Sequence, residues 1–113
     1  MLIYKIVDAA SWRKALDDGA FFGSADDARD GFIHFSTASQ VRATLARHFA
    51  GRPDLVIAAA DSERLGDALK WEPSRGGALF PHLYVNLPVD AVRWWKPLSL
   101  KSDGVHQLPG EVV

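Results

Sequence analysis

Two polar side chains in the segment GFIHFST (residues 31–37) are the first candidates for chemistry in this sequence. In an extended strand, side chains alternate between the two faces, so His34 and Ser36 are expected on the same side. Ile33 and Phe35 then lie on the other side and face the core. An imidazole beside a hydroxyl can bind and orient a polar ligand through hydrogen bonds. The segment therefore predicts a polar ligand site on a strand.

The junction after this strand is a second predicted feature of the site. Thr37 and Gln40 have the spacing of a capping box, which predicts a helix that begins at Thr37. The free N–H groups and the positive dipole end of such a helix favour a phosphate or a carboxylate. The structural alternative is that His34 donates to a backbone carbonyl in the core while Ser36 and Thr37 only cap the helix. The residues alone leave both interpretations open.

A second cluster lies in the segment KWEPSRGGALFPHLY (residues 70–84). Trp71 and Tyr84 offer flat faces for stacking, Arg75 offers a fork for phosphate or carboxylate, and Glu72 and His82 can exchange protons. The alternative is structural, because Trp71 can fill the edge of the core and Glu72 can form a surface ion pair with Arg75 at a spacing of three. From both segments, the candidate catalytic residues are His34, Glu72 and His82. The candidate ligand-binding residues are Ser36, Thr37, Trp71, Arg75 and Tyr84.

Two other reaction types are conceivable from the same side chains. His34, His82 and Glu72 would make a two-histidine, one-carboxylate metal site if the fold brought them together, but their spacing contains no metal-binding signature, so no metal ligand is assigned. Ser36 as nucleophile and His82 as base would make a hydrolase, but Ser36 lacks the sequence context of a nucleophile elbow. His48 and His106 are not expected to be catalytic.

The elements that must position these residues begin with an apolar run from Leu2 to Val7, which predicts a strand. Asp8 is expected to cap a helix whose apolar positions Trp12 and Leu16 are spaced by four and which ends at Gly19. A short strand is expected over residues 20–23. The small and acidic residues of the segment 24–30 are typical of an exposed loop.

Further along the chain, Val41, Leu45 and Phe49 recur every four residues and predict an amphipathic helix. The continuously apolar segment 55–60 predicts a central strand covered on both sides. Residues 61–77 are expected to form a long irregular loop with one or two helical turns. Strands are predicted around residues 83–85 and within 89–98, the latter with Trp94 and Trp95 on opposite faces.

Composition and length favour one globular domain. The chain has 113 residues, of which 48% are hydrophobic and 24% are charged, as in an average globular protein. We expect a single α+β domain over residues 1–98 and a loosely patterned tail over residues 99–113. The net charge of −1 and the interspersed charges argue against a nucleic-acid partner. With no cysteine, no signal peptide and no membrane-length apolar run, the expected location is the cytoplasm, without a membrane partner.

The segments GFIHFST, LVIAA and LKWEPSRGGALFPHLY, in this order, make the sequence similar to the bacterial domain-of-unknown-function family 952. The resemblance covers residues 2–98. It implies an ADP-ribosyltransferase-like fold, a single domain with a split mixed β-sheet and two or three helices. Such enzymes bind NAD in the cleft of the split sheet, so NAD becomes the candidate substrate.

The resemblance also implies roles for individual residues. His34 would contact the ribose on the nicotinamide side and Ser36 would be its hydroxyl neighbour, with Glu72, His82 and Tyr84 as further candidates. Val85 stands where a glycine is expected in the family. The predicted function is a cleft for NAD or an ADP-ribose-type nucleotide, with ADP-ribosyl transfer as the candidate reaction. The alternatives are a non-enzymatic module for a small anion or a protein partner, and a scaffold in which His34 is a core residue.

Overall fold

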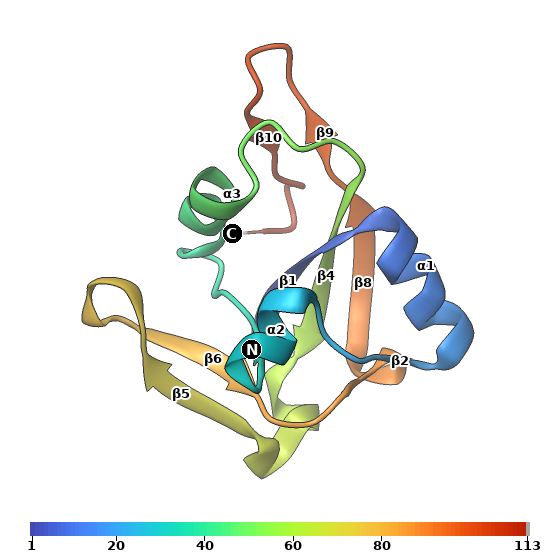
Figure 1. Cartoon of the computed structure of the whole chain (residues 1–113), viewed down its shortest axis with the longest axis vertical. Helices are drawn as coiled ribbons and strands as arrows, with labels where there is room; N and C mark the ends of the chain where they lie inside the picture. Colours follow the sequence, from blue (N-terminus) through green and yellow to red (C-terminus); the bar gives the residue numbers. More distant parts are fainter. Residues whose placement is uncertain (113) are drawn as a thin grey trace.

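The computed structural model describes residues 1–112 and contains two three-stranded sheets with helices around them (Figure 1). The first sheet has the order β1-β4-β8, and the second has the order β3-β6-β5. Every strand pairing among the described residues is antiparallel. The prediction of a mixed sheet was therefore wrong. The strands of the two sheets are β1 (Leu2–Asp8), β4 (Leu55–Asp61), β8 (Val92–Pro97), β3 (Ile33–His34), β6 (Leu79–Leu83) and β5 (Leu69–Pro73).

The first sheet has a hydrophobic cluster on each face. Strand β4 is buried along its whole length, and its side chains alternate between the two clusters. One cluster contains Trp12 of α1 (Ala9–Asp18), and the other contains Val41 and Leu45 of α3 (Val41–His48). Figure 1 accordingly shows α1 and α3 on opposite sides of this sheet. The prediction that residues 55–60 form a central strand covered on both sides is confirmed.

The two sheets meet at one point and then diverge. Tyr4 of β1 forms an isolated antiparallel bridge with Ser36, in which each backbone N–H donates to the other residue's carbonyl, at 2.8 and 2.9 Å. Beyond this bridge, β1 is an edge strand of its sheet. The backbone polar groups along that edge of β1 therefore face the space between the two sheets.

Two short strand pairs complete the chain. Strand β2 (Ala20–Phe21) pairs with β7 (Leu87–Pro88), and β9 (Ser99–Leu100) pairs with β10 (His106–Gln107) as a C-terminal hairpin. Short 3-10 helices lie at Ser62–Ala68, Arg75–Gly77 and Val89–Ala91. Among residues 1–112, no helix is both long and apolar enough to cross a membrane. The fold is a single compact α+β domain.

The helix predictions were correct where apolar side chains set the pattern. Helix α1 begins after Asp8, whose side chain accepts from the backbone N–H of Ser11, and it ends at Gly19 in a left-handed conformation. Its buried side chains are Trp12 and Ala15, whereas Leu16 is exposed. The predicted burial of Val41 and Leu45 on one helix is confirmed.

Two segments predicted as loops are regular structure. Residues 24–30 form a capped helix, α2 (Ala25–Asp30), in which the side chains of Ser24 and Asp27 each accept from the other residue's backbone N–H. Within residues 61–77, the predicted helical turns are confirmed by the 3-10 helix Ser62–Ala68, whereas β5 stands where an irregular loop was predicted. The strand predicted at residues 83–85 is β6, which ends at Leu83. Trp94 and Trp95 contact Tyr4 and Trp12, which belong to different clusters, so their predicted placement on opposite faces is confirmed.

Candidate functional site

A cleft of about 630 Å³ runs along the edge of β1, between α2, α3 and the β5–β6 hairpin. The cleft lies where the two sheets diverge, and its lining includes the Tyr4–Ser36 bridge and β1 from Tyr4 to Asp8. Its volume falls within the range of about 300–1,000 Å³ that is usual for sites of small molecules and cofactors. The cleft is therefore large enough for a nucleotide-sized ligand.

One wall of the cleft is basic. Arg47 lies in the last turn of α3, Arg52 follows in the next loop, and Arg75 lies at the turn of the β5–β6 hairpin. None of the three forms a salt bridge with any carboxylate in the described part of the chain. Burial, together with the charge of Arg47, lowers the pKa of Arg75. An anion in the cleft would therefore meet guanidinium groups with donors to spare.

The opposite wall, formed by α2, is acidic and is built around Asp27. This carboxylate is 3% exposed and accepts hydrogen bonds from Lys5 Nζ, the backbone N–H groups of Ser24 and His34, and His34 Nδ1. The His34 Nδ1 contact is 2.6 Å long, and His34 Nε2 lies 2.8 Å from Asp30 Oδ2. Both ring nitrogens of His34 can donate at once only in the imidazolium form. His34 is thereby held against α2 at the edge of the cleft.

Lys5 is an unexpected member of this wall. It lies on the same face of β1 as Ile3 and Val7 and, like them, it is buried. Its ammonium group lies 2.9 Å from Asp27 Oδ2, which compensates for the burial of both charges. Burial alone would raise the pKa of Asp27, but the hydrogen bond from His34 and the charge of Lys5 outweigh it and hold that pKa well below its usual range. Asp27 is therefore ionised throughout the neutral range.

A chain of hydrogen bonds joins Ser36, Thr44 and Arg75 in the cleft. Ser36 Oγ lies 2.8 Å from Thr44 Oγ1, and Arg75 Nη2 donates to the same Thr44 oxygen at 2.9 Å. Thr44 in turn donates to the carbonyl of Gln40. The guanidinium of Arg75 also lies over the ring of Phe80, with its Cζ atom 4.9 Å from the ring centroid. These contacts fix Arg75 in place while leaving most of its donors unused.

His82 lies on β6 directly opposite His34 of β3, with the two ring centroids 5.7 Å apart. Its Nδ1 is 2.8 Å from Glu72 Oε1, to which Tyr84 also donates at 2.8 Å. Phe32 stacks on the His82 ring with a centroid distance of 3.9 Å. Hydrogen bonds from His82 and Tyr84 lower the pKa of Glu72. His82 is 5% exposed, and its Nε2 has no hydrogen-bond partner among residues 1–112.

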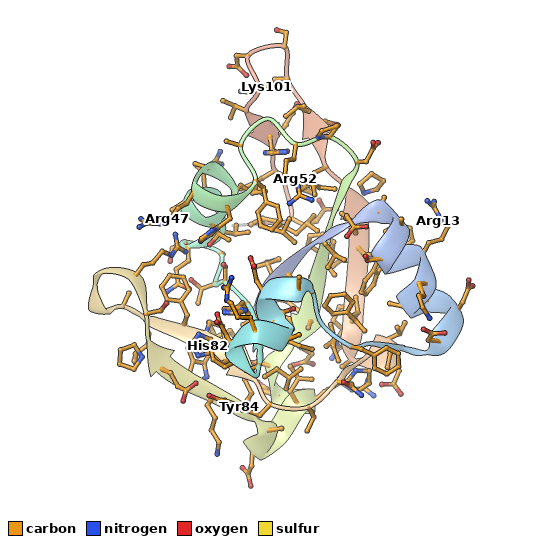
Figure 2. The ribbon with its side chains drawn as sticks, viewed as in Figure 1. Arg13, Arg47, Arg52, His82, Tyr84 and Lys101 are labelled. Atoms are coloured by element: carbon orange, nitrogen blue, oxygen red, sulfur yellow. The ribbon has the colours of Figure 1, made fainter. Side chains whose placement is uncertain are left out.

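The structure divides the predicted site residues into two groups. His34, Ser36, Arg75 and His82 line the cleft. Glu72 and Tyr84 contact His82 from outside it, and Trp71 and Thr37 do not line it. Figure 2 shows His82 between the basic residue Arg47 on one side and Tyr84 on the other. The two sequence segments therefore converge, but only part of each reaches the cleft.

The anion-binding place predicted at the start of the helix after Thr37 does not form. Helix α3 begins at Val41, and the backbone N–H groups of Gln40 and Val41 both donate to the carbonyl of Thr37. Only half of the capping box exists, because Gln40 Oε1 accepts from the Thr37 N–H while the Thr37 hydroxyl lies 3.2 Å from that of Ser39. The cationic group of this helix that lines the cleft, Arg47, lies instead at the other end of the helix.

The residues that the sequence analysis missed are Lys5, Asp27, Arg47 and Arg52, together with His48, which also lines the cleft. A signal existed for Asp27, because Ser24 and Asp27 have capping-box spacing. A lysine in an otherwise apolar strand was a signal for Lys5. No group of three or more His, Asp or Glu side chains in residues 1–112 is arranged to hold a metal ion, so His34, His82 and Glu72 do not form the metal site that was considered.

The fold and the cleft define a class of protein, namely a small antiparallel α+β domain with a two-walled polar cleft at the split between its sheets. The sequence profile described as "Protein of unknown function (DUF952)" matches residues 6–95. The chain belongs to this family. No curated protein is significantly similar to the chain.

The chain is also similar to a solved protein, CC0527 from Caulobacter crescentus. The crystal structure of CC0527 has a TM-score of 0.95 and 49% sequence identity, over 99% of this chain and 98% of that chain. A solution NMR structure of CC0527 has a TM-score of 0.85 and 51% identity, over 94% of this chain and 91% of that chain. The similarity to CC0527 therefore includes the C-terminal hairpin that lies beyond the matched family segment.

Proposed function

We propose that the cleft binds a nucleotide of the NAD or ADP-ribose type. The observation that carries this proposal is the basic wall, on which Arg47, Arg52 and Arg75 line one cleft and form no salt bridge within residues 1–112. Guanidinium groups bind phosphate through paired, charge-assisted hydrogen bonds. A diphosphate placed on this wall would satisfy donors that the protein leaves free.

The opposite wall suits the sugar of such a ligand. His34 and Asp30 lie at the mouth of the cleft, and Ser36 lies on its floor, so polar groups are available for ribose hydroxyls. A cleft at the split of a β-sheet also agrees with the ADP-ribosyltransferase-like fold that the sequence resemblance implies. Trp71 and Tyr84, the ring-stacking candidates from the sequence, lie outside this cleft, so the base would have to pack against other side chains.

ADP-ribosyl transfer is the reaction that we propose for this cleft. The bond between the ribose C1′ and the nicotinamide nitrogen breaks, and nicotinamide leaves with the electron pair. An acceptor hydroxyl forms the new bond to C1′ and loses its proton to His82 Nε2. Glu72 is a positioning residue, because it orients the His82 ring through Nδ1. The carboxylates of α2 are the groups able to stabilise positive charge that develops on the ribose.

Binding is tested by titrating the protein with ADP-ribose in a calorimeter. We expect saturable binding of ADP-ribose and of NAD, and at least tenfold weaker binding of adenosine, which lacks the phosphates that the arginines recognise. A thermal shift that follows ligand concentration gives an independent readout. Absence of saturable heat and of any thermal shift with ADP-ribose, in a folded protein, would contradict the proposed function.

The second candidate is a non-enzymatic module that holds a small anion in the same cleft. The observation in its favour is that Glu72 does not reach the cleft and that Asp27 and Asp30 both contact His34. Such a module would bind ADP-ribose or another phosphate ester without releasing nicotinamide from NAD.

Replacing Glu72 by glutamine discriminates between the two candidates. If the protein transfers ADP-ribose, nicotinamide release should fall by about tenfold to a hundredfold, because His82 loses the carboxylate that orients it. Affinity for ADP-ribose should change by no more than about twofold, because Glu72 lies outside the cleft. Glu63→Gln, an exposed carboxylate in the 3-10 helix after β4, is the matched control. Equal nicotinamide release by wild type and Glu72→Gln would rule out this role of the Glu72–His82 pair.

A further inference from the structure

The C-terminal hairpin contacts the loop that carries Arg52. His106 of β10 is 5% exposed, and its Nε2 donates to the backbone carbonyl of Arg52 at 2.7 Å. The backbone N–H of Gly51 donates to the carbonyl of Gly104 at 3.2 Å. Figure 1 shows the β9–β10 hairpin beside the segment that joins α3 to β4, and Figure 2 places Arg52 in that segment.

The loop needs this support because its backbone is unusual. Gly51 has a φ of 73° and Asp54, which is not a glycine, has a φ of 59°, so two residues of the loop are left-handed. Within the loop, only the backbone bond from the Arg52 N–H to the Phe49 carbonyl closes the turn. The Ala9 N–H also donates to the Asp54 carbonyl at 2.8 Å, and the Arg52 guanidinium lies over the Phe49 ring, with its Cζ atom 5.2 Å from the ring centroid. The contacts from Gly104 and His106 add restraint at Gly51 and at the Arg52 carbonyl, and they reduce the conformations open to this part of the loop.

The hairpin is itself fastened to the body of the domain. Leu108 and Val112 pack against the hydrophobic cluster that contains Val41 and Leu45, and Lys96 of β8 forms an ion pair with Glu111. Residues 99–112 are therefore a structured support on the side of the cleft where Arg52 lies.

We propose that His106 is a positioning residue for anion binding, which holds the Arg52 loop against the cleft through the bond to the Arg52 carbonyl. This inference rests on the proposed function, since it gives the C-terminal hairpin a role in supporting the basic wall of the same cleft. The hairpin lies beyond the matched family segment. Because His106 contacts a carbonyl, its Nε2 must carry the proton. We expect His106 to change the affinity for a ligand only by positioning Arg52.

The test measures ADP-ribose affinity in His106→Leu, Arg52→Gln and the double variant. We expect each single variant to weaken binding by about threefold to tenfold, and the double variant to bind no more weakly than Arg52→Gln alone. His106→Gln, which offers an amide donor at the same reach, should recover most of the lost affinity. Lys101→Gln, at the tip of the same hairpin in Figure 2, should change affinity by less than about twofold.

Three results would overturn the inference. Wild-type affinity in folded His106→Leu would mean that the hairpin does not position Arg52. Additive losses in the double variant would mean that His106 acts by a route other than Arg52. If the wild-type protein binds neither ADP-ribose nor pyrophosphate, the proposed function fails, and the role assigned to His106 fails with it. The first two results leave the proposed function intact.

Discussion

Replacing Asp27 by asparagine is expected to lower the free energy of unfolding by about 3 to 5 kcal/mol, which is the usual cost of leaving one member of a buried ion pair without its partner. Lys5 and Asp27 are 6% and 3% exposed, and the Lys5 ammonium has no other acceptor among the described side chains. The same carboxylate caps α2 and holds His34. Urea denaturation of the variant and the wild type measures the difference.

Two further variants test whether the buried ion pair explains this loss of stability. Asp26→Asn removes an exposed carboxylate from the same helix, whose ion pair with Arg29 is solvent-exposed and contributes little to stability. The double variant Lys5→Met/Asp27→Asn should recover part of the stability, because it no longer buries an unpaired ammonium. If Asp27→Asn lowered the free energy of unfolding no more than Asp26→Asn does, Asp27 would not be the centre of the acidic wall.

The low pKa of Asp27 gives this prediction a pH dependence. A carboxyl whose pKa is lower in the folded protein than in the unfolded chain stabilises the fold fully above the unfolded value of about 3.9, and this stability is lost as the pH falls through the folded pKa. Wild type and Asp27→Asn should therefore differ by a constant amount near neutral pH. The difference should shrink steadily below about pH 4.

The fold could be predicted from the sequence in the segments where buried apolar side chains recur at a regular spacing. Helices α1 and α3 and strands β1 and β4 bury apolar side chains at regular spacing, so their patterns were informative. Helix α2 has six residues, and its buried residue is the charged Asp27, so no apolar period marks it. Strand β5 is an edge strand with mostly exposed side chains, and it could not be recognised by alternation of buried residues.

The candidate site was predictable to a similar degree. His34, Ser36, Arg75 and His82 were identified by residue type, and all four line the cleft. That His34 lies opposite His82 depends on the register of β3 and β6, which neither segment specifies alone. Arg47 and Arg52 become members of one wall only because α3 ends beside the hairpin that carries Arg75. Such a wall is a property of tertiary structure, and no local spacing predicts it.

Removing two positive charges from this wall is the most direct test of what the cleft binds. The double variant Arg47→Gln/Arg75→Gln should weaken ADP-ribose binding by about a hundredfold or more, since each charge-assisted hydrogen bond contributes about 1.5 to 3 kcal/mol and 1.4 kcal/mol corresponds to tenfold in affinity. Calorimetry at two salt concentrations gives the readout. Wild-type affinity should fall with added salt, and the variant should depend on salt less steeply.

The matched control is Arg13→Gln/Arg42→Gln, which removes the same number of charges from positions outside the cleft. Arg42 lies on α3 together with Arg47, whereas Arg13 lies on α1 at the far side of the molecule in Figure 2. The control should bind ADP-ribose within about threefold of wild type, because only the overall charge has changed. If both double variants lost affinity equally, the effect would come from net charge. The arginines of the cleft would then not be the recognition surface, and the proposed function would lose the observation that carries it.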